Sequence, residues 1–171
     1  GGPQAGIIVG SRNIIDKIKR NPITRALRPD KITLAALHAV LKLYTNPATL
    51  AEELPTLRWL TRNVLDIEEL ATRLIPTIKK YCKNFQVEIE RPHSQVGSGA
   101  MPVDKIESVA LRISKPNLRR PGKDLKMLAK AFRQLPIPVI GRISNDALLF
   151  DLRCLEDEVG FNNNLRHLSL P

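Results

Sequence analysis

The sequence predicts an α/β protein in which a helical amino-terminal part precedes a small domain with a mainly antiparallel sheet. Up to about residue 83, apolar residues recur at steps of three and four, which indicates helices. From Phe85 they alternate with polar residues, which indicates strands. We therefore expect three parts: residues 1–54, a connecting helix over residues 55–84, and a compact α/β domain over residues 85–171 with helices on one face of its sheet.

Short elements are expected at the beginning of the chain. Residues 5–9 form an apolar run that predicts a buried strand closed by Gly10. Ser11 is a candidate cap for a helix that ends at Arg20, before Asn21-Pro22. One further helical turn is then expected over residues 24–28.

A helix over residues 31–44 should follow, capped by Asp30. It is apolar on nearly every face, so a large core or a subunit interface would be needed to cover it. We expect this helix to expose apolar surface in the 171-residue chain.

The connecting segment has the pattern of one long amphipathic helix over residues 55–83. Pro55 suits its first turn, whereas Pro76 removes a backbone donor and predicts a kink. The apolar positions that define it are Leu57, Leu60, Val64, Ile67, Leu70, Leu74 and Ile78.

The carboxy-terminal part should contain four strands and a basic helix. We expect strands over residues 85–90 and 106–113, then a helix over residues 122–135. A hairpin is predicted from residues 137–143 and 147–152, around Ser144-Asn145-Asp146. A last helix should begin near Arg153, and three consecutive asparagines at residues 162–164 should weaken it.

The charge balance favours contact with a polyanion. Lys and Arg total 27 against 17 acids, a formal charge of +10. The excess gathers in residues 1–31 and 112–133. Two separate basic clusters favour a nucleic-acid partner, although a solvated charged surface is the alternative. Aromatic residues make up only 4% of the chain, which argues against a stacking platform for bases.

No complete catalytic constellation, P-loop or metal-ligand spacing is present in the sequence. Cys82 and Cys154 are far apart and are expected to be reduced thiols. No run of eighteen apolar residues predicts a membrane span. The long glycine-containing loop over residues 92–105 is either functional or a plain connector.

Arg25 and Arg28 are a more specific signal. At a spacing of three on one helical turn, they should project from the same face and clamp an oxyanion such as phosphate. A solvated basic face is the alternative that the spacing leaves open.

Several blocks, in order, resemble bacterial selenocysteine synthases, the L-seryl-tRNA(Sec) selenium transferases, which are fold-type-I pyridoxal-phosphate enzymes. The resemblance covers almost the whole chain. Its blocks are Gly1-Gly2-Pro3-Gln4-Ala5-Gly6-Ile7-Ile8-Val9-Gly10, Arg25-Ala26-Leu27-Arg28 with Asp30-Lys31, Leu54-Pro55-Thr56-Leu57-Arg58, Ser94-Gln95-Val96-Gly97-Ser98-Gly99, Pro138-Val139-Ile140-Gly141-Arg142-Ile143 and Asp151-Leu152-Arg153-Cys154-Leu155-Glu156-Asp157-Glu158.

The resemblance implies a cytoplasmic homo-oligomer that uses pyridoxal 5'-phosphate to convert seryl-tRNA(Sec) into selenocysteyl-tRNA(Sec). Elimination of the seryl hydroxyl gives a dehydroalanyl-tRNA, to which selenium from selenophosphate is added. The family's Schiff-base lysine is expected just upstream of Gly1, so the 171 residues by themselves are expected to be inactive. Residues 1–54 would then be a remnant of the large cofactor-binding domain, and residues 85–171 the small carboxy-terminal domain.

The same resemblance implies roles for individual residues. The carboxyl group of an aminoacyl-tRNA is esterified, so arginines are free to bind phosphate, and Arg25 and Arg28 are assigned to the phosphate of the selenium donor. Weaker candidates for lining the cleft are Gly1, Gly2, Gln95, Ser98 and Arg142. Candidates for touching tRNA, with a solvated helix face as the alternative, are Arg119, Arg120, Lys123, Lys126 and Lys130.

Two other functions remain open from the sequence. A related pyridoxal-phosphate lyase or transferase acting on a free amino acid would need an arginine for the substrate carboxylate. A non-catalytic basic RNA-binding module would need only the charged surface.

Overall fold

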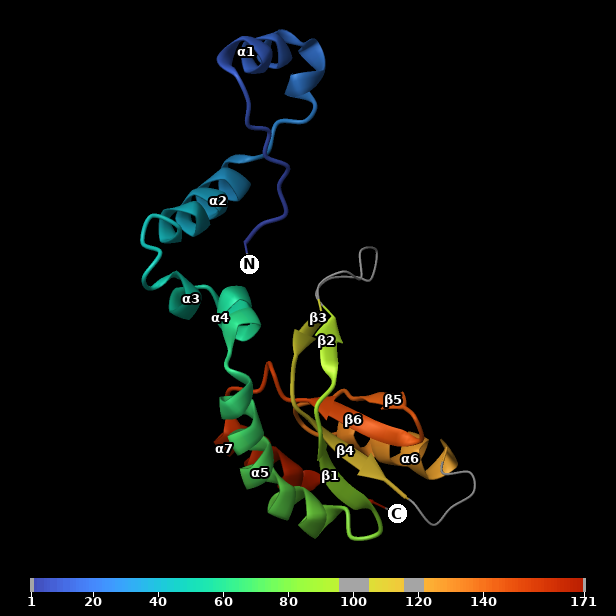
Figure 1. The fold of residues 1–171 in the computed structure, drawn as a ribbon. Helices are drawn as coiled ribbons and strands as arrows, with labels where there is room; N and C mark the ends of the chain where they lie inside the picture. Colours follow the sequence, from blue (N-terminus) through green and yellow to red (C-terminus); the bar gives the residue numbers. More distant parts are fainter. Residues whose placement is uncertain (1, 96–104, 116–121, 171) are drawn as a thin grey trace. The chain divides into compact units, whose positions relative to one another are not determined.

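The computed structural model describes residues 2–95, 105–115 and 122–170. The chain divides into two compact units, Gly1–Thr61 and Arg62–Pro171. The first is helical, and the second combines a sheet with helices (Figure 1). This mixed α/β fold with an antiparallel sheet confirms the predicted fold class.

The first unit consists of short helices joined by capped turns. The side chain of Asn21 accepts a hydrogen bond from the Ile23 amide at 3.0 Å, and Asp30 accepts one from the Thr33 amide at 2.8 Å. Both are side-chain N-caps, which satisfy otherwise unpaired amides at a helix start. The elements are α1 Arg12–Arg20, the 3-10 helix η1 Pro22–Arg25, α2 Lys31–Leu43, α3 Leu50–Glu53 and α4 Pro55–Thr61.

The strand predicted over residues 5–9 is wrong. The segment forms no strand, and its apolar side chains are exposed, Ile8 by 70%. A strand needs a neighbour for its backbone groups, and no described residue pairs with this segment. An apolar run alone does not supply that neighbour.

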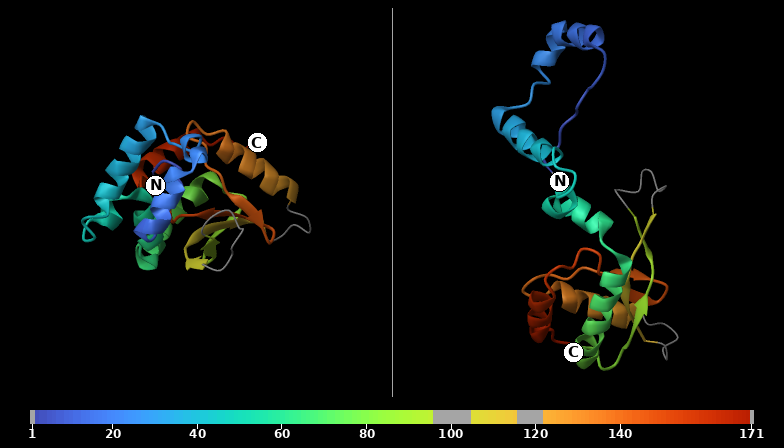
Figure 2. Two further views of the ribbon diagram at one scale, coloured as in Figure 1. Left: turned by 90° about the horizontal axis from the view of Figure 1, so that it is seen from above. Right: turned by 60° about the vertical axis from the view of Figure 1, so that its left-hand side comes forward.

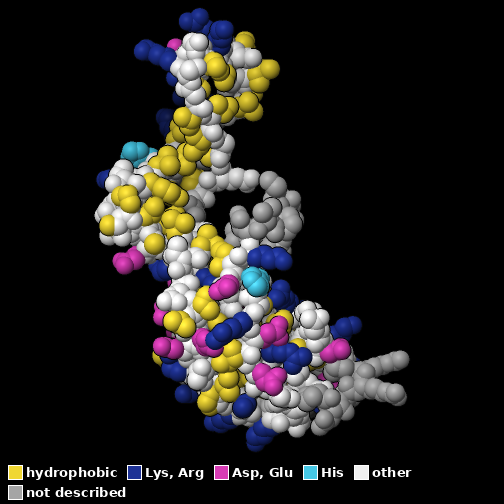
Figure 3. Space-filling view, in the orientation of Figure 1, with side chains coloured by type: hydrophobic (Ala, Val, Ile, Leu, Met, Phe, Trp, Pro, Cys, Tyr) yellow, Lys and Arg dark blue, Asp and Glu magenta, His cyan; other side chains and the backbone are white. Residues whose placement is uncertain are grey.

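The first unit buries very little of its apolar surface. Leu54 is the one buried hydrophobic residue among those described in this unit. Helix α2 has no buried residue, and Ile32 on it is 82% exposed, which confirms the expectation for this helix. Figure 3 shows hydrophobic side chains, in yellow, gathered over α2.

The single connecting helix predicted over residues 55–83 is also wrong, because it divides into two. Helix α4 ends at Thr61, and α5 spans Val64–Tyr81, with Pro76 inside it. The Asn63 side chain accepts a hydrogen bond from the Leu65 amide at 3.0 Å and so starts a new helix. The boundary between the two units falls at this break.

The second unit is built on a four-stranded antiparallel sheet of order β1-β4-β6-β5. Its central register places Glu88, Arg112, Leu149 and Arg142 in one row across the strands. The strands are β1 Gln86–Glu90, β4 Ala110–Ser114, β5 Arg142–Ser144 and β6 Ala147–Asp151, and a separate ribbon pairs β2 His93–Gln95 with β3 Lys105–Glu107.

The strand predicted over residues 106–113 divides into β3 and β4, and β2 was not predicted. The division falls at Ser108 and Val109. The Ser108 amide donates to the Pro92 carbonyl at 3.0 Å, and the Val109 carbonyl accepts from the Leu152 amide at 3.0 Å. The chain therefore leaves one ladder and enters another at this point.

The predicted hairpin forms between β5 and β6, although β5 is shorter than expected. Ser144 pairs with Ala147, which leaves Asn145 and Asp146 as a two-residue loop. Their φ values are +47° and +53°, the left-handed conformation that a tight hairpin turn requires and that Asn and Asp tolerate.

One face of the sheet carries the core of the second unit. Alternate residues of the strands share a single buried cluster with α5, with α6 Gly122–Arg133 and with Leu165 at the start of η2 Leu165–His167. The course of these elements can be followed in the two further ribbon views of Figure 2. Phe132 on α6 and Phe150 on β6 lie with ring centroids 4.6 Å apart. On the opposite face Arg112 pairs with Glu88 at 3.5 Å and Glu90 at 3.3 Å.

The last helix, α7 Glu158–Asn164, includes all three asparagines that were expected to weaken it. Asn164 is buried and hydrogen-bonded to the backbone of Ile137, so it serves the fold instead of opposing it. None of the helices that the structure describes combines the length and apolarity needed to cross a membrane.

Candidate functional site

Arg25 and Arg28 lie together in the first unit. Arg25 ends η1, and Arg28 follows in the link to α2, so the two are not on one regular helical turn as predicted. They nevertheless line one open hollow of about 600 Å³ with Thr24 and Pro29. Side-chain caps lie on either side of this pair, Asn21 at the start of η1 and Asp30 at the start of α2.

The two guanidinium groups are available to a ligand. Both side chains are exposed, and neither forms a hydrogen bond or ion pair with another residue of the described ranges. Asp30, the nearest acid in sequence, is used elsewhere: its carboxylate accepts from the backbone amide of Thr33, and this bond and the Thr33 hydroxyl lower the pKa of Asp30. An arginine pair without an acidic partner is suited to a doubly charged oxyanion.

The other predicted cleft residues are dispersed. Gly2 has a φ of +132°, and a Cβ there would lie 3.1 Å from Val40 on α2, so it needs to be glycine for its packing. It does not line the arginine hollow. Gln95 ends β2 opposite Lys105, and Arg142 is exposed at the start of β5, both in the second unit. Gly1 and Ser98 lie outside the described residues, as do Arg119 and Arg120.

A second polar cluster was missed by the sequence analysis. The Asp151 carboxylate accepts hydrogen bonds from the Ser94 hydroxyl, from the Ser108 hydroxyl at 2.7 Å and from the Arg153 amide at 3.0 Å. It thereby ties the end of β6 to β2, one residue before Gln95. The only feature of the sequence that pointed to Asp151 was its position as the first residue of the block 151–158 in the family resemblance.

Beside this cluster, the side chains of Arg153 and Arg62 each donate a hydrogen bond to the backbone carbonyl of the other residue. Arg153 is buried and donates to the carbonyls of Arg62, at 3.1 Å, and Glu107. Arg62 donates in return to the carbonyls of Leu152, Arg153 and Leu155, the last at 2.7 Å. These two arginines join the turn after β6 to the segment before α5, because each guanidinium group donates to backbone carbonyls of the other segment.

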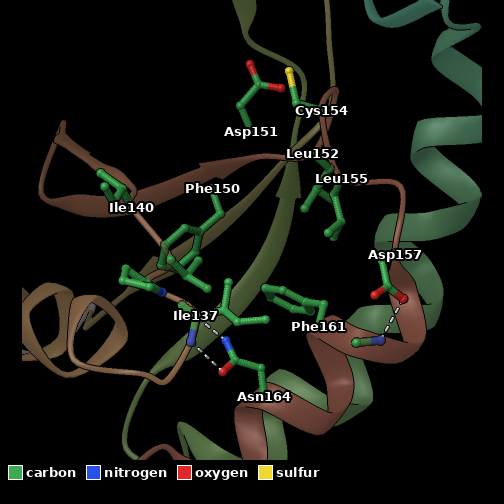
Figure 4. A pocket seen from close by; sticks show the side chains of 13 residues that line it. Ile137, Ile140, Phe150, Asp151, Leu152, Cys154, Leu155, Asp157, Phe161 and Asn164 are labelled. Atoms are coloured by element: carbon green, nitrogen blue, oxygen red, sulfur yellow. Dashed lines mark hydrogen bonds between the residues drawn. The ribbon is translucent and has the colours of Figure 1, made fainter. Parts of the chain in front are cut away.

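An apolar hollow of about 410 Å³ lies next to that turn (Figure 4). At one side the Asn164 amide faces Ile137, accepting from its N–H at 3.1 Å and donating to its carbonyl at 2.7 Å. Among its other lining residues are Ile140, Phe150, Leu155 and Phe161. Apart from Asp151, Cys154 and Asp157 at its edge, the described lining of the hollow has no titratable side chain.

The two thiols are poor nucleophiles. Burial raises the pKa of Cys82 to about 12, and burial, followed by the Asp151 carboxylate, raises the pKa of Cys154. Both thiols are therefore protonated at neutral pH. In the described ranges no group of three His, Cys, Asp or Glu residues is placed to hold a metal ion. The arginine hollow remains the best candidate for binding a charged substrate.

Comparison with known proteins gives a consistent match. A model of one protein family, described as L-seryl-tRNA selenium transferase, matches residues 1–156. The L-seryl-tRNA(Sec) selenium transferase of Klebsiella pneumoniae (strain 342) is 51% identical over 161 residues, which cover 94% of this chain and 34% of that protein.

Two further relatives carry the same name. That of Methylocella silvestris is 52% identical over 169 residues, which cover 98% of this chain and 35% of the relative. That of Escherichia fergusonii is 49% identical over 162 residues, which cover 94% and 35%. The chain thus spans about a third of the length of the curated relatives it matches.

Proposed function

Because this chain belongs to the family of L-seryl-tRNA selenium transferases, we propose that it serves in a transferase that converts seryl-tRNA(Sec) into selenocysteyl-tRNA(Sec). Selenophosphate is the proposed selenium donor. The observation that carries the assignment of residues is the hollow in which Arg25 and Arg28 lie side by side without an acidic partner in the described ranges.

The chemistry of the substrates explains why an arginine pair is useful. In an aminoacyl-tRNA the amino-acid carboxyl is an ester, so there is no free carboxylate for an arginine to bind. The remaining anions are the donor's phosphate, the tRNA backbone and the phosphate of a cofactor. Arg25 and Arg28 would bind the donor phosphate through paired N–H groups and hold its charge as the selenium–phosphorus bond breaks.

Pyridoxal phosphate is the proposed cofactor, and its phosphate would suit the same kind of site. Among the residues that the structure describes, the lining of the hollow consists of Thr24, Arg25, Arg28 and Pro29, with no lysine for a Schiff base and no carboxylate for a pyridine nitrogen. The hollow therefore fits an oxyanion and does not by itself fit the whole cofactor. Cofactor dependence is supported by the family alone, as are the proposed homo-oligomer and cytoplasmic location.

The test is to replace both arginines with alanine in the complete gene product. We expect kcat/KM for selenophosphate to fall at least about a hundredfold, since two charge-assisted contacts are lost. The visible absorbance of bound pyridoxal phosphate and the affinity for seryl-tRNA should remain. Transfer of radioactive selenium to seryl-tRNA measures the first effect.

Arg20→Ala is the matched control, because it removes an exposed arginine of the same unit that does not line the hollow. It should leave transfer unchanged, and Arg25→Lys with Arg28→Lys should restore only part of the activity. Full transfer by the double alanine variant would show that the donor phosphate binds elsewhere. A complete gene product that takes up no pyridoxal phosphate would overturn the proposed function itself.

A further inference from the structure

A basic hollow of about 330 Å³ lies in the second unit, away from the sequence blocks that carry the family resemblance. It forms where the end of α5, the segment leading into β1, the end of β4 and α6 come together. Its lining includes three lysines, Lys80, Lys83 and Lys115, and one acid, Asp124. These residues are separated by up to 44 positions in sequence, so it is the fold that concentrates the charge.

The charges in this hollow are not equivalent. The Lys115 ammonium lies 2.7 Å from an Asp124 carboxylate oxygen and 5.6 Å from the centre of the Phe85 ring, so the one acid in the described part of the lining is already paired. The Lys80 ammonium lies 5.7 Å from the centre of the Tyr81 ring. Neither Lys80 nor Lys83 forms a hydrogen bond or ion pair with a residue of the described ranges. Two exposed ammonium groups are thus free to bind an anion.

We infer that this hollow is a contact site for backbone phosphates of RNA. The inference rests on the proposed function, because that function makes tRNA the RNA that the protein would bind. Ammonium groups on flexible stems bind phosphodiesters as point charges, without reading sequence. Both aromatic rings already face an ammonium group, so the site reads charge and does not stack bases. It is a positioning contact that adds affinity.

The surroundings favour a long polyanion over a small one. Exposed lysines continue the positive surface outside the hollow on α6, namely Lys123 and Lys126. Asp124, paired with Lys115, is the one acid on α6. An RNA backbone can meet several of these charges at once, whereas a single phosphate can meet only those in the hollow.

One competing explanation concerns α5 alone. Lysines in the last turn of a helix stabilise its carbonyl end, and Lys79 and Lys80 both occupy that turn. Lys79 does not line the hollow. Because Lys79 and Lys80 share the charge and the helix turn, Lys79→Ala is a matched control that separates the two roles.

The experiment measures binding of a tRNA(Sec) transcript by the complete gene product over a range of salt concentrations. Lys80→Ala and Lys83→Ala should each lower the affinity about fivefold near 0.1 M salt and reduce the slope of log K against log salt by about one. Lys79→Ala should change the affinity by less than about twofold and leave the slope unchanged. Thermal unfolding of the three variants is measured in parallel.

Three outcomes would overturn the inference. Equal weakening by all three variants would indicate diffuse charge, and unchanged binding by Lys80→Ala and Lys83→Ala would place the contact elsewhere. An affinity loss that follows a loss of thermal stability would indicate a helix-end role. The proposed function is judged separately. If the complete gene product binds tRNA but transfers no selenium, the proposed function is contradicted and the RNA contact site is still supported.

Discussion

The two units of this chain have similar helical sequence patterns but very different cores. In the second unit, α5, α6 and the sheet share one buried cluster that includes Ile67, Leu111 and Phe132, all fully buried. In the first unit no side chain of α1 or α2 is fully buried, and Leu54 is the single buried hydrophobic residue described there. The difference shows that apolar periodicity specifies a helix without specifying what will cover it.

The largest expected effect on stability comes from creating a cavity in the core of the second unit. Phe132→Ala removes a ring that packs on Phe150, and we expect it to lower the free energy of unfolding by about 3–5 kcal/mol. Leu27→Ala removes a side chain that is 76% exposed in the first unit and should change it by less than about 0.5 kcal/mol. Thermal unfolding by circular dichroism, with hydrogen exchange of peptides from each unit, measures both. Similar effects would show that the first unit is packed in solution.

A smaller effect on the free energy of unfolding is expected from replacing a glycine by alanine in each unit. Gly141 lies in a block of the family resemblance, and a Cβ there would lie 2.7 Å from the Leu149 carbonyl oxygen and 2.8 Å from the Phe150 ring. Gly141→Ala should therefore lower the free energy of unfolding by about 1–3 kcal/mol.

Gly6→Ala is its control, because a Cβ at Gly6 would meet nothing within 4 Å. It should be neutral or slightly stabilising, since alanine restricts the unfolded chain. Urea unfolding of both variants measures the difference. A neutral Gly141→Ala would mean that β5 and its approach can move away from β6.

Much of the fold was predictable because its signals are local. The period-two pattern from Phe85 predicted β1, and Asp30 marked the start of α2 correctly. The break before α5 also has a local signal, the capping residue Asn63, which the prediction of one continuous helix from the apolar stripe did not use. Sequence-local chemistry thus predicts where elements begin better than long periodicity predicts where they stop.

What could not be predicted depends on partners distant in sequence. Asn164 strengthens α7 because Ile137, 27 residues away, needs both of its backbone groups satisfied. The hydrogen bonds of Asp151 and Arg153 likewise join β6 to residues before β4. For the candidate site, the spacing of Arg25 and Arg28 predicted their proximity, and the structure adds the open hollow and, among the residues it describes, the lack of an acidic partner. Which anion they bind stays a prediction.

The smallest expected effect is the pH response of the α2 start in the first unit. The Thr33 amide and hydroxyl donate to Asp30 and lower its pKa. A carboxylate with a lowered pKa stabilises the folded chain above its unfolded pKa, about 3.9, and this contribution is lost as pH falls through the folded value. Amide exchange at Thr33 should therefore be about threefold faster in Asp30→Ala than in the unmodified chain at pH 5, and this ratio should fall as the pH is lowered below the unfolded pKa. Asp30→Asn should keep the cap over the whole pH range, because an amide oxygen accepts without titrating. A protection factor at Thr33, the exchange rate relative to that of an unstructured peptide at the same pH, that changes with pH in Asp30→Asn would assign the response to another group and remove Asp30 as its origin.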